Sequence, residues 1–98
     1  MNKEEILKKL RENKEKIKEF GVKRIGVFGS FARDEAGEES DIDIIVEFEE
    51  GKKNFDNFIN LAFFLEELFG KKIDLLTSES ISPYIKPYVE KEVIYERL

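Results

Sequence analysis

The sequence predicts a small α/β (α+β) domain, in which helices and short strands share one core. Three observations support this prediction. The chain has 98 residues, enough for a single domain over residues 1–98 and too few for a second core. Residues 41–48 alternate between apolar and other side chains with the two-residue period of a strand. Residues 55–69 have apolar side chains at the spacing of a helix.

The first expected element is a helix that ends before Gly21. Asn2 can cap its start, and Glu5 stands where the acid of a capping box belongs. Apolar residues recur at helical spacing along one side: Ile6, Leu10, Ile17 and Phe20. Gly21 is the residue type that commonly ends such a helix.

Two strands are expected next, separated by a polar segment. The first covers residues 24–28 and stops at Gly29-Ser30, and residues 31–39 are interpreted as a short helical turn followed by a loop. On the second strand, residues 41–48, one face is wholly apolar: Ile42, Ile44, Val46 and Phe48. Asp41 and Asp43 share the opposite face.

The helix over residues 55–69 has an unusually wide apolar face. The main interpretation is that this whole face lies in the core. The alternative is that part of it contacts a partner protein, although a wide stripe is weak support for an interface.

The remaining elements are a third strand and a C-terminal helical segment. The strand covers residues 72–77 and puts Asp74 on the face opposite Ile73 and Leu75. Ser82-Pro83 is expected to begin a helix that Pro87 breaks or restarts. The last residues, 89–98, form a helix or a helix plus a short strand.

The composition excludes several kinds of chemistry. The chain has no cysteine and no histidine, which rules out thiolate zinc sites, cysteine nucleophiles and imidazole bases. Any bound metal must have oxygen ligands, which favours Mg²⁺, Mn²⁺ or Ca²⁺. The net charge of −5 disfavours nucleic acid as a direct partner. With no signal peptide and no run of roughly 20 apolar residues, we expect no membrane contact and a cytoplasmic location.

Three aspartates are candidate metal ligands and catalytic groups. Asp41 and Asp43 project from one strand, and Asp74 projects from another. If the strands are neighbours, the three carboxylates repel one another, and a bound Mg²⁺ would relieve that repulsion. Asp43 and Asp74 interrupt otherwise apolar strands, which is typical of a functional site. The alternative is that Asp41 caps the loop end and Asp43 is merely solvated.

The turn at Gly29-Ser30 is a candidate phosphate-binding segment. Backbone N–H groups at such a turn bind anions, and glycine allows a phosphate to approach closely. Arg33 could contact a phosphate or form an ion pair within the protein, and neither is favoured. Ser40 is expected to cap the loop before the second strand, with nucleotide contact as the alternative.

The specific signal is the combination Gly29-Ser30, ten residues, and Asp41-Ile42-Asp43. Together with residues 29–33 and 40–46, it resembles the minimal nucleotidyltransferase family, a branch of the DNA polymerase β-like superfamily. Residues 20–28 resemble the approach and first strand of that family, and residues 71–77 resemble the strand with its third acid. The likeness covers nearly the whole chain.

The resemblance implies a fold, an activity and a set of site residues. The fold would be a small nucleotidyltransferase fold, a mixed β-sheet packed with helices. Asp41 and Asp43 would bind one or two Mg²⁺ ions. Asp74 would be the third ligand and help to activate an acceptor hydroxyl. Gly29 and Ser30 would hold the triphosphate of the substrate, for which ATP is the family expectation.

The resemblance also implies a biological role. Similar small proteins act as antitoxins of HEPN-domain ribonucleases and transfer AMP from ATP to a tyrosine of the toxin. Two alternatives stay open. The chain could be a noncatalytic antitoxin that acts by direct binding, or a nucleotidyltransferase that acts on a small molecule or RNA.

Overall fold

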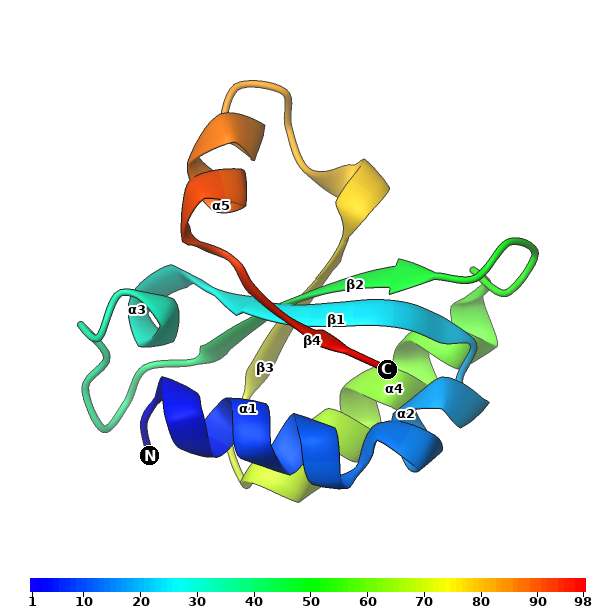
Figure 1. Ribbon diagram of the computed structural model, residues 1–98, viewed down its shortest axis with the longest axis horizontal. Helices are drawn as coiled ribbons and strands as arrows, with labels where there is room; N and C mark the ends of the chain where they lie inside the picture. The colour runs from blue at the N-terminus through cyan, green and yellow to red at the C-terminus, as the bar shows by residue number, and fades with distance from the viewer.

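The computed structural model describes residues 1–98 and contains a mixed four-stranded sheet (Figure 1). The strands are β1 (Val22–Phe28), β2 (Ile42–Phe48), β3 (Ile73–Thr77) and β4 (Ile94–Arg97). They lie in the order β3-β2-β1-β4. β1 is antiparallel to both β2 and β4, whereas β2 and β3 are parallel. The expected α/β fold with a mixed sheet is therefore confirmed.

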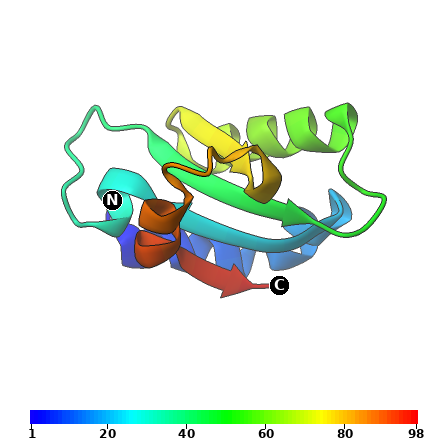
Figure 2. The same cartoon turned by 90° about the horizontal axis from the view of Figure 1, so that it is seen from above.

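Helices flank the sheet on both faces. α1 (Lys3–Glu12), α2 (Lys14–Glu19) and α4 (Phe55–Phe69) lie on one face, as Figures 1 and 2 show. The 3-10 turn η1 (Ser78–Ser80) and α5 (Lys86–Glu92) rise from the other. The short α3 (Gly29–Ala32) directly follows β1. No helix has both the length and the apolar character that crossing a bilayer requires.

The core lies between the sheet and α1, α2 and α4. Strand β2 contributes the apolar alternates predicted for it, and each is buried: Ile42, Ile44, Val46 and Phe48. Ile6 and Leu10 from α1 and Leu61 and Leu65 from α4 pack against them and are also buried. Each fully buried aliphatic side chain contributes about 1.5–3 kcal/mol, so this face determines the orientation of β2. Asp43 must then project from the opposite face.

The N-terminal helix is interrupted, which corrects the expectation of one continuous helix. Asn2 caps α1 by accepting the Glu5 N–H at 2.9 Å, as predicted. The helix ends at Asn13, whose side-chain amide donates to the Lys9 carbonyl at 2.8 Å. Asparagine competes with the backbone for such hydrogen bonds, which is why it favours helix ends. Gly21, at φ +84°, follows α2 as the expected terminating residue.

The helix α5 begins at Lys86, so the predicted start at Pro83 is wrong. The Ser82 carbonyl accepts the Lys86 N–H at 2.9 Å, and the Ser82 hydroxyl accepts the Tyr84 N–H at 3.3 Å. These bonds close a turn before the helix. Pro87 lies in the first turn of α5, where its missing N–H costs nothing. β4 follows, which confirms the helix-plus-strand alternative for the last residues.

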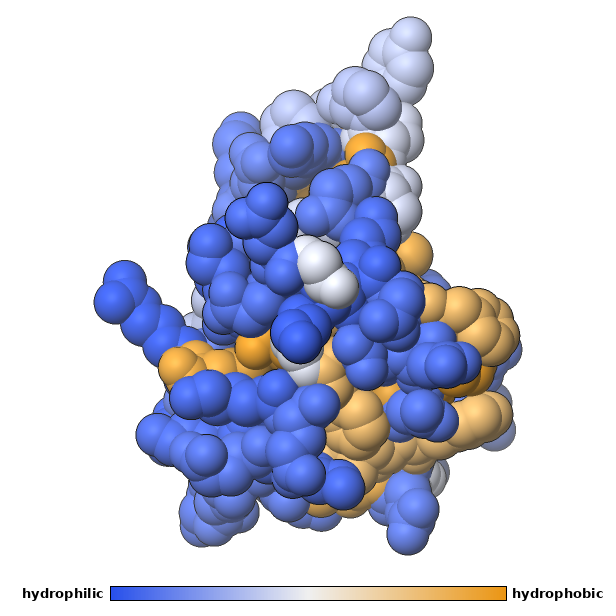
Figure 3. All heavy atoms as spheres, turned by 90° about the vertical axis from the view of Figure 1, so that its right-hand side faces the viewer, coloured by the Kyte–Doolittle hydropathy of each residue, from blue (hydrophilic) through white to orange (hydrophobic).

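The helix α4 has the predicted bounds but not the predicted burial. Leu61, Leu65 and Phe69 are buried in the core. Phe55, by contrast, is 76% exposed and Phe63 is 61% exposed. The interpretation that the whole apolar face is core is therefore wrong for Phe55. Figure 3 shows an apolar area on the side of the molecule that α4 forms.

Candidate active site

Strand pairing brings two of the three candidate aspartates together. β2 and β3 are parallel neighbours, and Asp43 is the register partner of Asp74. Asp43 is half-buried, whereas Asp74 is exposed near the edge of the sheet. Asp41 is exposed and directly precedes β2. The two strands thus present a group of carboxylates on the sheet face opposite the main core.

The environment of Asp43 disfavours its charged form. Burial, followed by the negative charges of Asp74 and Asp41, raises the pKa of this carboxyl to about 6, against a smaller lowering by Arg33. No three acidic side chains stand in a metal-holding arrangement. Asp41 and Asp74 are exposed, however, and exposed side chains change rotamer within nanoseconds. The relative positions of the three carboxylates can therefore change without any movement of the backbone.

Gly29 and Asp43 are in close contact, and the contact requires glycine. Gly29 has φ +73°, a conformation that other residues rarely adopt. A Cβ atom at this position would lie 2.0 Å from Asp43 Oδ2 and 2.8 Å from its Cγ. The Asp43 carboxylate therefore lies directly against the turn that the sequence predicts as a candidate phosphate-binding segment.

The donors expected to hold phosphate are paired with a carboxylate that the sequence did not identify. The Gly29 N–H donates to Glu92 Oε1 at 2.9 Å. Arg33 donates from Nη1 to Glu92 Oε2 at 2.9 Å and from Nε to Glu35 at 3.2 Å. These two acids, Glu92 first, raise the pKa of Arg33 above its usual value. Of the two roles considered for Arg33, the ion pair is the one that the structure contains.

The two serines of the predicted site differ in their surroundings. The Ser30 hydroxyl is half-buried and makes no hydrogen bond within the chain, although its backbone carbonyl accepts the Glu35 N–H. The Ser40 hydroxyl accepts the Gly37 N–H at 2.9 Å, which is the expected loop cap. Ser30 is therefore free to donate to a ligand, whereas Ser40 already closes the loop before β2.

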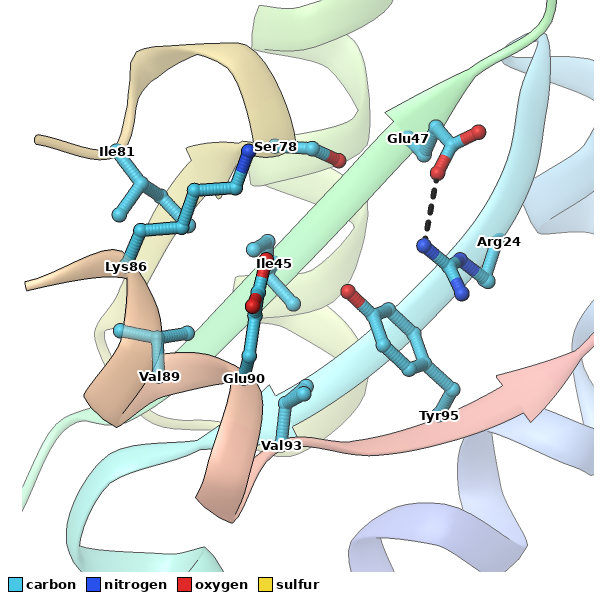
Figure 4. A pocket seen from close by; sticks show the side chains of 10 residues that line it. All are labelled: Arg24, Ile45, Glu47, Ser78, Ile81, Lys86, Val89, Glu90, Val93 and Tyr95. Carbon is cyan, nitrogen blue, oxygen red and sulfur yellow. Dashed lines mark hydrogen bonds and ion pairs between the residues drawn. The ribbon is translucent and has the colours of Figure 1, made fainter. Parts of the chain in front are cut away.

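A cavity of about 220 Å³ lies on the same face of the sheet as Asp43 (Figure 4). Ile45 and Glu47, which alternate with Asp43 along β2, form part of its floor, and α5 covers one side. Arg24 stacks on the Tyr95 ring at 3.8 Å and pairs with Glu47 at 3.0 Å. None of the three aspartates lines a cavity, so the acidic group itself stands at an open surface.

Replacing Asp43 with asparagine is expected to stabilise the protein in the absence of metal. The native pKa of about 6 exceeds the usual 3.8, so the native state holds this proton more tightly than the unfolded state does. The free energy of unfolding of the parent protein should fall as the pH rises from about 4 to about 6. Because Asp43 is partly solvated, we expect a gain of about 1 kcal/mol at pH 7.5, or roughly 4–8 °C in melting temperature.

Thermal unfolding in the presence of EDTA, at about pH 4.5 and pH 7.5, would measure this gain. The Glu39→Gln variant is a matched control, because Glu39 is exposed and forms no hydrogen bond or ion pair through its side chain. The control should leave the melting temperature unchanged at both pH values. A melting temperature of Asp43→Asn at or below that of the parent protein at pH 7.5 would contradict the explanation.

Comparison with known proteins shows that the likeness extends over nearly the whole chain. The nucleotidyltransferase domain family matches residues 3–96. The protein adenylyltransferase MntA of Thermococcus cleftensis is 45% identical over 93 residues, which cover 94% of this chain and 93% of that protein. A solved minimal nucleotidyltransferase is 35% identical with a TM-score of 0.74, over 96% of this chain and 95% of its own. A chain from a toxin–antitoxin crystal structure with AMP-PNP is 25% identical with a TM-score of 0.67, over 97% of this chain and 72% of its own.

Proposed function

Because this chain belongs to the nucleotidyltransferase domain family, we propose that it is a Mg²⁺-dependent protein adenylyltransferase that acts as an antitoxin. Its reaction would transfer AMP from ATP to a tyrosine hydroxyl of a cognate HEPN-domain toxin. The observation that carries the proposal is the contact of Asp43 with Gly29 on one side and its register pairing with Asp74 on the other. This arrangement supports the proposal because it would join a metal-binding acid to a phosphate-binding turn within one site.

The residues present fit Mg²⁺. The candidate ligands, Asp41, Asp43 and Asp74, offer carboxylate oxygens, which are the ligand type that Mg²⁺ prefers. The pKa of Asp43 is raised first by burial and then by the negative charges of Asp74 and Asp41, and a bound cation would offset those charges. Asp41, Asp43 and Asp74 would hold the metal. When bound, Mg²⁺ supplies positive charge that offsets the charge developing on the phosphate oxygens.

The protein's own groups would orient the reactants and accept a proton. The Gly29 N–H, the Ser30 hydroxyl and Arg33 are the donors for the triphosphate. The acceptor oxygen bonds to the α-phosphorus, the bond from that phosphorus to the bridging oxygen breaks, and pyrophosphate leaves. Asp74 is exposed beside Asp43, where one of its carboxylate oxygens can take the hydroxyl proton.

Two likenesses support the choice of nucleotide and acceptor. The similar toxin–antitoxin complex contains AMP-PNP, an analogue of ATP. The similar Thermococcus protein is named a protein adenylyltransferase, so the acceptor in its reaction is a protein. The open surface around Asp74 suits an acceptor that brings its own binding surface, since no cavity encloses the acidic group. A tyrosine and a HEPN-domain toxin follow from the family resemblance.

Incubation with ATP labelled at the α-phosphate, Mg²⁺ and a purified HEPN-domain toxin from the same organism would test the proposal. We expect label on the toxin, on a tyrosine located by mass spectrometry, and no label when EDTA replaces Mg²⁺. ATP labelled at the γ-phosphate should leave the toxin unlabelled, because pyrophosphate departs. A stable complex that neutralises the toxin without any labelling would instead support an antitoxin that acts by binding alone.

A further inference from the structure

The Glu92 carboxylate accepts hydrogen bonds from two groups that are expected to donate to the triphosphate, the Gly29 N–H and the Arg33 guanidinium. It accepts the Gly29 N–H through one oxygen and pairs with Arg33 through the other, both at 2.9 Å. Its side chain is only 23% exposed, so the contact lies within the site. A backbone N–H donates one strong hydrogen bond at a time. A phosphate oxygen and Glu92 therefore compete for Gly29.

The surrounding charge makes the competition stronger. The Asp43 carboxylate lies against Gly29, so the turn is already flanked by two acids when Glu92 is present. Arg33 is the one cation that contacts Glu92, and it is also shared with Glu35. A triphosphate that approached this turn with Glu92 in place would meet like charge at close range.

The Glu92 side chain can also move away from Gly29 and Arg33 without unfolding a helix or a strand. Glu92 is the last residue of α5, and Val93 after it is extended and leads into β4. Glutamate has three rotatable side-chain bonds, so a change of rotamer frees the Gly29 N–H and Arg33 together. No other acidic side chain hydrogen-bonds the Gly29 N–H.

We propose, on the basis of the function proposed above, that Glu92 is a positioning residue of the nucleotide site. Its carboxylate holds the Gly29 turn and Arg33 in order before ATP binds, and it yields both donors to the triphosphate. The cost of displacing it is part of the measured affinity for ATP. Removing its charge should therefore increase that affinity.

Equilibrium binding of a nonhydrolysable ATP analogue with Mg²⁺ to the parent protein and to Glu92→Gln would test this role. The amide keeps the shape of the side chain but is a weaker, uncharged acceptor. Replacing a charge-assisted hydrogen bond by a neutral one should lower the Kd for the analogue by about fivefold. The melting temperature should fall slightly or stay unchanged. A residue that only braces the structure would lose stability and affinity together.

The Glu90→Gln variant is the matched control, because Glu90 is on the same helix and touches neither Gly29 nor Arg33. It removes the same charge and should leave the Kd within about twofold of the parent value. Tighter binding by Glu92→Gln alone supports the proposal. Equal or weaker binding by Glu92→Gln, or equal tightening by both variants, overturns it while leaving the proposed function intact. Absence of any nucleotide binding by the parent protein would overturn the proposed function itself.

Discussion

A variant with Asp41→Asn and Asp43→Asn is expected to lose transfer of labelled AMP to the toxin by about a thousandfold, equivalent to about 4 kcal/mol of transition-state stabilisation. Asp43 lies on β2 against Gly29 and Asp41 directly precedes the same strand, and asparagine keeps their size while removing the charge that would attract Mg²⁺. The measurement is the initial rate of labelling at saturating ATP and toxin.

Loss of activity in this variant should not come from unfolding. Removing the charge of Asp43 relieves burial and repulsion, so the variant should be at least as stable as the parent protein without metal. Toxin binding, measured by titration calorimetry, should be retained because neither asparagine alters an apolar contact. If toxin activity in cells stays neutralised by the variant, the chain acts by binding alone and the transferase proposal fails.

Replacing Gly29 with alanine is expected to lower the transfer rate by about a hundredfold, because the Asp43 carboxylate must move. The new Cβ would lie 2.0 Å from Asp43 Oδ2 and 3.1 Å from its Cβ, so a rotation of the carboxylate alone does not relieve the overlap. The left-handed backbone at φ +73° adds a cost of about 1–2 kcal/mol to folding. Labelling rates and melting temperatures would both be measured.

The chain offers a matched control that separates these two effects. Gly51 has a similar φ of +78°, but a Cβ there would have no atom within 4 Å. The Gly51→Ala variant should lose a similar conformational contribution to stability and keep its transfer rate. Equal rates for Gly29→Ala and the parent protein would show that the position of Asp43 against the turn is unimportant.

The spacing of apolar residues along the chain was sufficient to predict most helices and strands and the sheet face on which Asp43 lies. The alternation of Ile42, Ile44 and Val46 identified the buried face of β2, and the same two-residue period assigned Asp43 to the opposite face. The bounds of α4 followed from its apolar period, and the structure shows in addition that Asn54 caps its start by accepting the Asn57 N–H at 2.8 Å. Such features depend on neighbours within one turn or one strand, which lie close together in the sequence.

The sequence was less informative where two local preferences compete. Asn13 lies within a helical pattern, yet its side-chain bond to Lys9 accompanies a break between α1 and α2. Pro83 is a favourable first residue of a helix, yet the turn closed by Ser82 delays α5 to Lys86. In both cases a polar side chain or a turn competes with helix formation, and propensity alone does not rank the two.

The amino-acid sequence by itself determined which face of β2 carries Asp43 and which face of β3 carries Asp74, because side-chain direction follows from the strand period. Tertiary structure alone decided that β2 and β3 are parallel neighbours, so that Asp43 meets Asp74. It also decided that Glu92 reaches Gly29 across 63 positions of sequence. Strand pairing and long-range hydrogen bonds depend on how the whole chain buries its apolar faces. The residues that such contacts bring together therefore show no periodic pattern in the sequence.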